Sequence, residues 1–382
     1  MVWPSRFPTK FPFRFGYVSQ RPTFLPAAPA AKVIGDTQIV SVHTNTGVQL
    51  YQFLGNELID LTWSRDLRAT SRCEVTVSSE LDYNRLPDLV PWQHWVSVWD
   101  ETGQTLYWTG PIQKVAATRE SVVISARDVS SLLTRTRCPM TKRWDTTDPA
   151  DVAGELWRAM AEHHGLNIAP IVRYDPLGDK FDFAAVADEQ LLDKLSDELV
   201  GFGLYWTVVS GTPVMGPMPR DPVAALGETD FVGGGITVVR DGSQFHNDVL
   251  LRSGDAVSRA RVPLGTLNLQ TIVNIDSMFG VSNTDRAVKQ YARYVSTIRD
   301  TVILPSNSVL HPYAPVSIDQ LVPSARLVVD AYGVLVLMQL TGVDVTYPSE
   351  TSSVSIRMES VDDELPELVD IQEKDSMSGI GA

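Results

Sequence analysis

The chain has 382 residues, 43% of them hydrophobic, which is enough to bury two or three cores and predicts a multi-domain globular protein. Its formal net charge of −14 argues against tight binding of nucleic acid, because phosphate binding requires clustered Lys and Arg. The apolar stretches fall far short of the roughly 20 residues that a bilayer requires, and the N-terminus has no secretory pattern, so we expect a soluble, unsecreted chain.

Residues 1–36 form an arm rich in prolines and aromatic residues. Six prolines by residue 29 preclude regular structure, and an extended segment of this length reaches on the order of 100 Å. A disordered tail remains the alternative, but disordered segments are poor in aromatic residues. We therefore expect an inter-subunit clasp, whose interface residues are Trp3, Phe7, Phe11, Phe13, Phe15, Tyr17 and Phe24.

A long segment occurs twice in the chain. Residues 89–128 and 321–360 align without a gap at an offset of 232, with nine identities in forty positions. Both copies begin with Leu-Val-Pro, alternate apolar and polar residues, and contain Thr-Gly, which predicts matching antiparallel strands and turns. The residues that mark this structural repeat are Pro91, Thr109, Gly110, Pro323, Thr341 and Gly342.

A further strand match extends the repeat upstream. Residues 73–80 resemble 247–254 at an offset of 174, which predicts an insertion of about 58 residues in the second copy. Short, regular strands of this kind suggest sandwiches or small barrels. The predicted fold class is α+β, mainly β, with two duplicated antiparallel β-barrel or sandwich domains and α/β insertions.

Three segments have helical periodicity: 147–165, 188–203 and 283–298. The predicted organisation follows from these helices and the repeat. It comprises an arm at 1–36, a first β-barrel domain at 37–142, an α/β module at 143–220, a second β-barrel domain at 221–262 and 300–362, a helical insertion at 263–299 and an acidic tail at 363–382.

Signals for catalysis or metal binding are weak. The adjacent His163 and His164 would diverge by about 100° on a helix and favour a helix end over a metal site. The glycines at 233–235 lack the context of a phosphate loop, and the acidic residues at 175–183 lack the spacing of a calcium loop. The two cysteines favour buried thiols. We therefore predict no catalytic residue, no metal, no cofactor and no enzymatic activity.

Several runs resemble the tail-tip or baseplate hub proteins of tailed phages, in particular the minor tail proteins of long, non-contractile-tailed phages of actinobacteria. These runs are LIDLTWSRDLRATSRCEVTVSSE, WVSVWDETGQTLYWTGPIQKV, VVISARDVSSLL and ADEQLLDKLSDELVGFGLYWTV, within a resemblance that covers about residues 37–362. Larger relatives carry a lytic or host-binding domain after the hub. This sequence stops at residue 382 and departs from them there, so we expect no peptidase role.

The resemblance implies that the two duplicated β domains are of the tail-tube type. It also implies a homotrimer at the distal end of the virion tail, assembled in the host cytoplasm. Three chains with two similar barrels each would present six units to a hexameric distal tail or tail-tube protein. Other tail-tip proteins and the tape measure protein are the further expected partners, with DNA only in transit and no stable membrane insertion. An acidic conduit would repel the DNA that passes through it.

A tail-tip protein that binds or cleaves glycans of the host cell wall remains the alternative function. Exposed aromatic residues could form a platform for sugar rings, whereas their period-two spacing is equally typical of buried strand faces. The residues of this alternative platform are Trp92, Trp95, Trp99 and Trp108.

Overall fold

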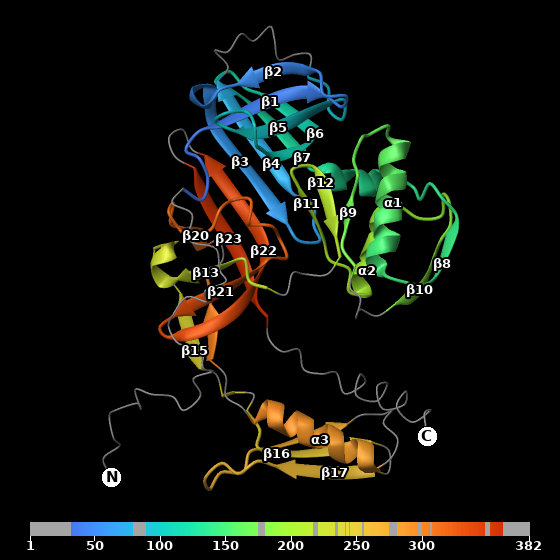
Figure 1. The fold of residues 1–382 in the computed structure, drawn as a ribbon, viewed down its shortest axis with the longest axis vertical. Coiled ribbons are helices and arrows are strands. Elements are labelled where there is room, and N and C mark those ends of the chain that lie inside the picture. The colour runs from blue at the N-terminus through green and yellow to red at the C-terminus, as the bar shows by residue number, and fades with distance from the viewer. Residues whose placement is uncertain are drawn as a thin grey trace.

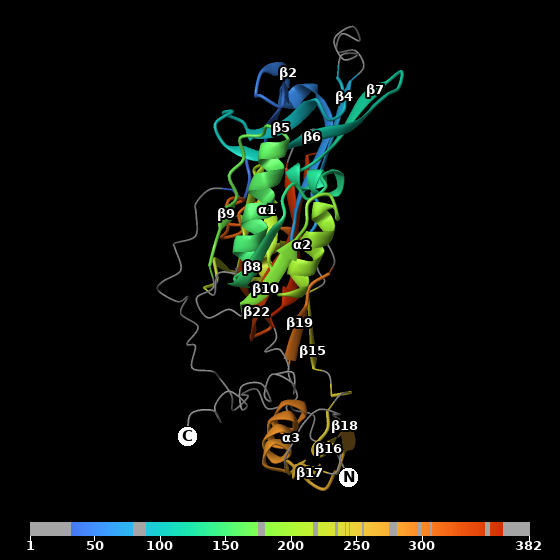
Figure 2. The same ribbon diagram turned by 90° about the vertical axis from the view of Figure 1, so that its right-hand side faces the viewer.

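The structure, a computed structural model, is mainly β, and most of its strands pair antiparallel (Figure 1, Figure 2). This confirms the predicted fold class, while the duplication within it stays a proposal. The structure describes residues 32–78, 89–174, 180–216, 221–233, 236–240, 242–243, 245–253, 256–274, 281–296, 300–305, 308–347 and 352–361.

The first β half is an antiparallel array of seven strands. Its strand order is β2-β1-β5-β6-β7-β4-β3, so most neighbours in space are also close in sequence. Alternating buried and exposed positions along β4 and β7 place one face of each strand in the core. The strands are β1 (Gln38–Thr44), β2 (Gln49–Phe53), β3 (Leu58–Asp66), β4 (Arg72–Ser78), β5 (His94–Asp100), β6 (Leu106–Ala117) and β7 (Ser121–Arg127), with the short helices η1 (Gly55–Glu57) and η2 (Val129–Arg135).

The second β half contains six strands of the main sheet. Its order is β14-β20-β23-β22-β21-β13, and β13 pairs with β21 in parallel. The two halves form one continuous sheet because β22 also pairs with β3. The elements are β13 (Ala224–Gly227), η3 (Glu228–Asp230), β14 (Phe231–Val232), β20 (Ser308–Leu310), β21 (Arg326–Ala331), β22 (Val334–Tyr347) and β23 (Ser353–Ser360).

An α/β module lies between the two halves in sequence and has its own core. Helix α1 begins where the Asp148 side chain accepts a hydrogen bond from Ala150 N, with Pro149 in the first turn, and Gly165 follows its end at φ +64°. The apolar faces of α1 and α2 pack on tryptophans of neighbouring strands. The elements are β8 (Lys142–Thr147), α1 (Pro149–His163), β9 (Ile171–Val172), β10 (Phe181–Ala185), α2 (Leu192–Gly201), β11 (Trp206–Val209) and β12 (Thr212–Met215).

An inserted subdomain extends from the second half on a two-stranded stem, at the lower end of Figure 1. Helix α3 covers a three-stranded sheet around a separate core of Val249, Leu251, Ala287, Val288 and Ala292. The stem is β15 (Thr237–Arg240) with β19 (Asp300–Ile303), and the subdomain contains β16 (Asp248–Ser253), β17 (Ala256–Arg261), β18 (Gln270–Asn274) and α3 (Val281–Val295).

The strand match between 73–80 and 247–254 is therefore wrong. β4 pairs with β7 inside the main sheet, whereas β16 pairs with β17 and β18 in the subdomain. An apolar alternation identifies a strand but not its partner, which is why the sequence placed β16 and β17 in the second barrel (221–262) instead of with α3. The other predicted domain boundaries stay predictions.

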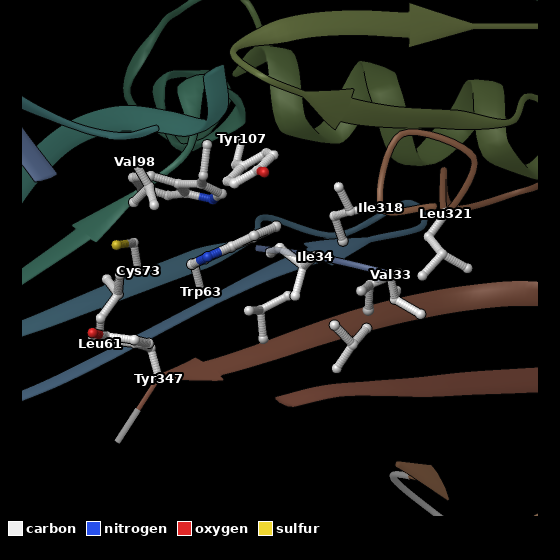
Figure 3. Close-up of a cluster of buried hydrophobic side chains, with 14 of the residues drawn as sticks. Val33, Ile34, Leu61, Trp63, Cys73, Val98, Tyr107, Ile318, Leu321 and Tyr347 are labelled. Carbon is white, nitrogen blue, oxygen red and sulfur yellow. The ribbon is translucent and has the colours of Figure 1, made fainter. Parts of the chain in front are cut away.

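One hydrophobic core runs through both β halves (Figure 3). Trp63 stacks on Tyr107 with ring centroids 6.0 Å apart. The last residues of the predicted arm (1–36) belong to the same core, because Val33 and Ile34 are buried; Val33 N donates to the carbonyl of Pro312 and Ile318 N donates to the carbonyl of Val33, each at 2.8 Å. The arm therefore starts from a fixed point between the two halves.

Candidate assembly interface at the junction of the two β halves

The junction between the two halves is a run of antiparallel pairs. Residues 61–66 of β3 pair with residues 342–347 of β22, while the opposite edge of β3 pairs with β4. β3 therefore forms a hairpin with β4 of the first half, and its other edge pairs with β22 of the second half. Backbone ladders of this kind specify a fixed register, because a slip of one residue would turn the buried side chains outward.

Arg65 fills the interior of this junction and is only 1% exposed. Its Nη1 donates to the carbonyls of Ile318 at 2.8 Å and Leu321 at 3.3 Å, and its Nη2 donates to the carbonyl of Tyr107 at 3.1 Å. Burial lowers the pKa of Arg65 to about 10, so the side chain stays charged at neutral pH. One guanidinium thus fixes a connector of the second half against a strand of the first.

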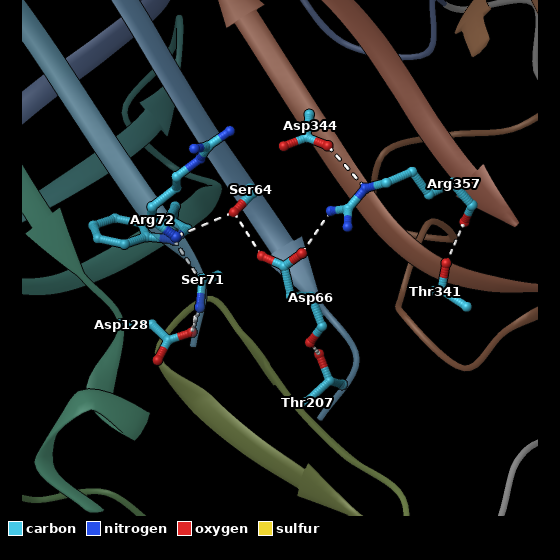
Figure 4. A network of polar contacts seen from close by, with 10 residues as sticks. Ser64, Asp66, Ser71, Arg72, Asp128, Thr207, Thr341, Asp344 and Arg357 are labelled. Atoms are coloured by element: carbon cyan, nitrogen blue, oxygen red, sulfur yellow. Dashed lines mark hydrogen bonds and ion pairs between the residues drawn. The ribbon is translucent and has the colours of Figure 1, made fainter. Parts of the chain in front are cut away.

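A network of charged residues covers the outer end of the junction (Figure 4). Arg357 on β23 donates to Asp66 through Nη2 at 2.5 Å and to Asp344 through Nε at 3.1 Å. Burial lowers the pKa of Arg357, but the carboxylates of Asp66 and Asp344 raise it more, so the net shift is upward. The hydroxyl of Thr207 donates to the backbone carbonyl of Asp66 at 2.9 Å and ties the α/β module to the same point.

Asp128 is a buried carboxylate that joins β7 to the start of β4 and to η2. It accepts hydrogen bonds from Ser71 N at 2.8 Å and Ser71 Oγ at 2.5 Å, and from Ser130 N at 2.8 Å and Ser130 Oγ at 2.5 Å. Burial raises the pKa of Asp128, and the four hydrogen bonds offset only part of this rise.

The middle strands of the two halves correspond at an offset of 228. β5 pairs Trp99 with Leu106 next to its turn, and β21 pairs Ala331 with Val334 at the same place. Trp99 and Ala331 differ by 232, while Leu106 and Val334 differ by 228. The turn between β21 and β22 is therefore four residues shorter than the turn between β5 and β6. The turn between β22 and β23 is four residues longer than that between β6 and β7, because β7 and β23 correspond at an offset of 232 again.

A β-bulge marks the same position in both middle strands. The register of β6 against β7 shifts between Ile112 and Lys114, and the register of β22 against β23 shifts between Leu340 and Gly342. The two shifts differ by 228 in residue number. The gap-free alignment of the sequence is therefore wrong within this strand, since turn length varies more readily than strand pairing.

The Leu-Val-Pro motif recurs with a structural reason. Pro91 and Pro323 precede Trp92 and Ser324, which have positive φ angles of 69° and 87°. Trp92 N donates to the carbonyl of Ile112, the first residue of the bulge in β6, at 2.7 Å. Ser324 N donates at the same distance to the carbonyl of Leu340, the first residue of the bulge in β22. The motif thus builds a left-handed turn that caps each bulge.

The Thr-Gly pairs, in contrast, lie in different environments. A Cβ on Gly110 would lie 1.9 Å from the carbonyl oxygen of Arg127, whereas Gly342 faces the guanidinium of β23. The hydroxyl of Thr109 donates to β5, and that of Thr341 donates to β23. Their identity in sequence does not reflect one structural role.

Other predicted site residues separate into two groups. The arm residues Trp3, Phe7, Phe11, Phe13, Phe15, Tyr17 and Phe24 lie outside the described residues. Of the tryptophan platform, Trp95 and Trp108 are buried and Trp92 is 37% exposed. Trp95 and Trp99 border a pocket of about 520 Å³ between β1, β5 and loops of the α/β module.

Within the described part of the chain, no group of three or more His, Cys, Asp or Glu side chains could hold a metal ion. His43 Nε2 lies 2.7 Å from Ser97 Oγ in the pocket, and its Nδ1 lies 2.8 Å from the carbonyl of Thr44. A carbonyl in place of a carboxylate distinguishes this pair from a catalytic triad. No described helix is both long and apolar enough to cross a membrane.

Sequence reasoning missed the junction residues Arg65, Asp66 and Arg357. A signal for the first two was present, because LTWSRD at 61–66 is similar to ITVVRD at 236–241, with Thr, Arg and Asp at the same positions. The second of these runs enters β15, at the edge of the second half.

No protein-family model and no curated protein matches this chain. Solved structures of phage tail proteins are similar to it at low sequence identity. The 43 kDa tail protein of prophage MuSo2 from Shewanella oneidensis aligns with a TM-score of 0.52 at 12% identity, over 85% of this chain and 98% of that one. The chain therefore has the fold of a phage tail protein.

Two further tail proteins align over most of their length. The tail protein from Neisseria meningitidis MC58 has a TM-score of 0.49 at 16% identity, over 85% of this chain and 97% of that one. Prophage tail protein gp18 from Listeria monocytogenes EGD-e has a TM-score of 0.44 at 11% identity, over 90% of this chain and all of the other.

Proposed function

We propose that the chain is a structural hub of a phage tail tip, in which three copies form a ring of six similar β units. The ring closes or adapts the tail tube and connects it to distal tail proteins during DNA delivery. The observation that supports this best is the internal correspondence of the two β halves, which share strand order, bulge and capping turn within one sheet.

The symmetry argument gives the copy number. A tube of six-fold rings needs an end piece with six equivalent contacts, and a chain with two similar units provides them as a trimer. The proposed partners are a hexameric distal tail or tail-tube protein, other tail-tip proteins and the tape measure protein. The net charge of −14 supports passage of DNA without binding.

The resemblance of the sequence narrows this proposal to a minor tail protein of long, non-contractile-tailed actinobacteriophages, located at the distal end of the virion tail. In this proposal the role is structural, without catalysis. Near the end of the predicted arm, Val33 is hydrogen-bonded to Pro312 and Ile318 of the second half, which supports an arm that leaves the body at a fixed point toward a neighbouring subunit.

The mass of the purified full chain in solution tests the proposal. We expect a species of three times the 42.1 kDa chain mass, measured by sedimentation equilibrium or native mass spectrometry. The copy number per particle, from quantitative mass spectrometry against the tube protein, should also be three. A monomer at all concentrations together with a copy number of six in the particle would contradict the trimeric ring.

The glycan-binding alternative keeps one supporting observation, which is the position of Trp95 and Trp99 at the pocket. A fluorescence titration with host wall polysaccharide tests it, with Trp99→Ala as the comparison variant. Saturable quenching that disappears in this variant would favour glycan binding at the pocket, and an unchanged spectrum would contradict it.

A further inference from the structure

The inserted subdomain covers only one face of its three-stranded sheet. Val249 and Leu251 of β16 pack with α3 on the covered face, and residues paired across β16, β17 and β18 lie on the same face as each other. In both views α3 lies on the side of the sheet that is nearer the body (Figure 1, Figure 2). The opposite face, which we call the open face, consists of Asp248, Leu250, Arg252, Val257, Arg259, Arg261, Gln270, Ile272 and Asn274.

The open face carries positive charge that its own acidic residue does not neutralise. Arg259 donates to Asp248 through Nε at 2.6 Å and through Nη2, and this pairing holds the pKa of Asp248 well below its usual range. Asp248 is therefore ionised and already paired with one arginine. Arg252 and Arg261 are exposed, and neither forms a hydrogen bond or an ion pair with a residue that the structure describes. Two arginines of the open face are thus available to an anionic partner.

Apolar side chains lie beside these arginines. Val257 is 54% exposed and pairs with Arg252 across the strands, and Ile272 is 57% exposed and pairs with Leu250. A partner that carries only charge, such as a phosphate chain, would leave these side chains in water. A peptide with acidic and apolar residues could pair with the arginines and cover the apolar side chains as well.

The sequence contains one segment of this composition. Residues 362–375, which lie outside the described residues, have seven acidic residues and one basic residue, and they include Leu365, Leu368, Val369 and Ile371. Residues 241–299, which contain the open face, have seven basic and five acidic residues, whereas the whole chain has 32 basic and 46 acidic ones. The arm at 1–35 has five basic residues and no acid, so the open face would repel it. Charge therefore selects the C-terminal segment over the N-terminal one.

The start of this segment is close enough to the subdomain in chain length. Val361 N donates to the carbonyl of Leu337 on β22, and β22 also contacts β19 of the stem. The stem has four residues in each strand, which corresponds to about 13 Å, and the layer of α3 adds about 10 Å. Fourteen extended residues, the length of 362–375, reach about 50 Å. One chain can therefore bring its own C-terminal segment to its open face.

We propose that residues 362–375 bind the open face of the inserted subdomain in the same chain. Carboxylates of the segment pair with Arg252 and Arg261, and its apolar residues cover Val257 and Ile272. The segment then occupies a basic surface that would otherwise attract the phosphates of DNA. This contact lies within one chain and does not depend on the number of copies in the proposed ring.

Photochemical cross-linking on the full chain tests the contact directly. The variant Ile272→p-benzoylphenylalanine places a photoreactive group on the open face, and Lys289→p-benzoylphenylalanine places the same group on an exposed position of α3 as the matched control. After irradiation and proteolysis, mass spectrometry should find peptides from 362–375 linked to position 272, with a yield at least about tenfold above that of the control. Because exposed charges are screened by salt, the yield should fall at about 1 M NaCl.

The size of the cross-linked product decides whether the contact is within one chain. A product with the mass of a single chain supports the proposal. Equal yields from positions 272 and 289 would overturn it, as would links from position 272 to segments other than 362–375. Links to 362–375 that join only two different chains would also overturn the contact within one chain. None of these results bears on the trimeric ring, which is tested by the mass of the protein in solution.

Binding of DNA tests whether the segment covers the open face. The probe is a DNA duplex of about 30 base pairs at about 150 mM salt, measured by fluorescence anisotropy. A full chain in which all seven acids of 362–375 are changed to the corresponding amides should bind it at least about tenfold more tightly than wild type. Equal affinities of this amide variant and wild type would overturn the covering role.

Charge reversals added to the amide variant identify the surface that binds the DNA. Arg252→Glu/Arg261→Glu should return the affinity to the wild-type level. Lys180→Glu/Lys289→Glu changes the net charge equally at exposed positions away from the open face and should retain the tighter binding. If both pairs of reversals weaken binding to the same extent, the gain reflects overall charge, and the open face is not the surface that the segment covers.

Discussion

Single residues hold the two β halves and the α/β module together through buried polar contacts. Arg65 donates to three backbone carbonyls in an otherwise apolar interior, and Arg357 forms ion pairs with two carboxylates at the end of the same junction. Buried polar groups of this kind fix one arrangement, because displacement would leave several of them without partners. Asp128 has the same function between β4, β7 and η2.

The variant Asp128→Asn tests the buried carboxylate. At pH 7 we expect a loss of about 1–3 kcal/mol in the free energy of unfolding, because an amide nitrogen would face a donor of Ser71 or Ser130. The pKa of Asp128 is raised above 3.8 in the folded state, so the folded chain takes up this proton before the unfolded chain does as pH falls.

The sign of the pH effect follows. Protonation of Asp128 contributes stability that grows as pH falls through the folded pKa toward 3.8, and the Asn variant lacks this contribution. The stability difference between wild type and variant should therefore be larger at pH 4.5 than at pH 7, measured by urea unfolding. A difference that shrinks on acidification would contradict the raised pKa.

At the scale of elements, turns and bulges determine how each half is assembled. The residue after each Leu-Val-Pro adopts a left-handed conformation and donates to the bulge of the middle strand. Trp92 and Ser324 accept this strained conformation although glycine would adopt it without strain. Because the same turn occurs in both halves, we infer that it is needed at the point where the middle strand leaves its first neighbour, which is β5 for β6 and β21 for β22.

Ser324→Gly should stabilise the second half by about 0.5–1 kcal/mol. Relief of the left-handed backbone is worth about 1–2 kcal/mol for an L-residue, and the greater freedom of glycine in the unfolded chain offsets part of it. Ser324→Val, which places a β-branched residue at the same φ of 87°, should destabilise the chain. Chemical denaturation of both variants checks this, and equal stabilities would rule out strain at this turn.

At the scale of the whole molecule, the inserted subdomain is a separate unit on a stem. Its core residues come only from β16 and α3, and Arg240 pairs with Asp300 at the point where the stem meets it. Contacts across such a boundary are few, so each part retains its own stability.

Replacement of residues 241–299 by an Asn-Gly turn should therefore leave the remaining protein folded. An Asn-Gly pair suits the two-residue connection of antiparallel strands. We expect circular dichroism typical of β structure and a melting temperature within about 5 °C of wild type, because a loss of 1 kcal/mol shifts the melting temperature of a large domain by roughly 2–4 °C. Aggregation or loss of cooperative unfolding would show that the subdomain supports the body.

The predicted clasp belongs to the same scale. Deletion of residues 2–30 keeps the buried Val33 and Ile34, so the isolated chain should melt at an unchanged temperature. Incorporation into tails or the stability of the particle should fall, measured by copy number in purified particles and by their resistance to heat. Particles with unchanged incorporation and heat resistance would refute the clasp.

The sequence by itself determined the local features of this protein. The helix over 149–163 follows from the cap at Asp148, Pro149 and Gly165, and the Leu-Val-Pro turns follow from a motif of adjacent residues. Local propensity and turn chemistry act over a few residues, so they can be read without knowledge of the partner strands. The junction was only partly visible, in the repeated Thr, Arg and Asp of residues 61–66 and 236–241.

Only the tertiary structure decided which strands pair and in which register. The four-residue shift between β6 and β22, the position of β16 outside the main sheet, and the meeting of Arg65 with a connector more than 250 residues away all depend on contacts distant in sequence. A period of two identifies a strand and its faces but fits many partners equally well. The choice among them is made by the shared core and by buried groups such as Arg65, which exist only once the two halves are assembled.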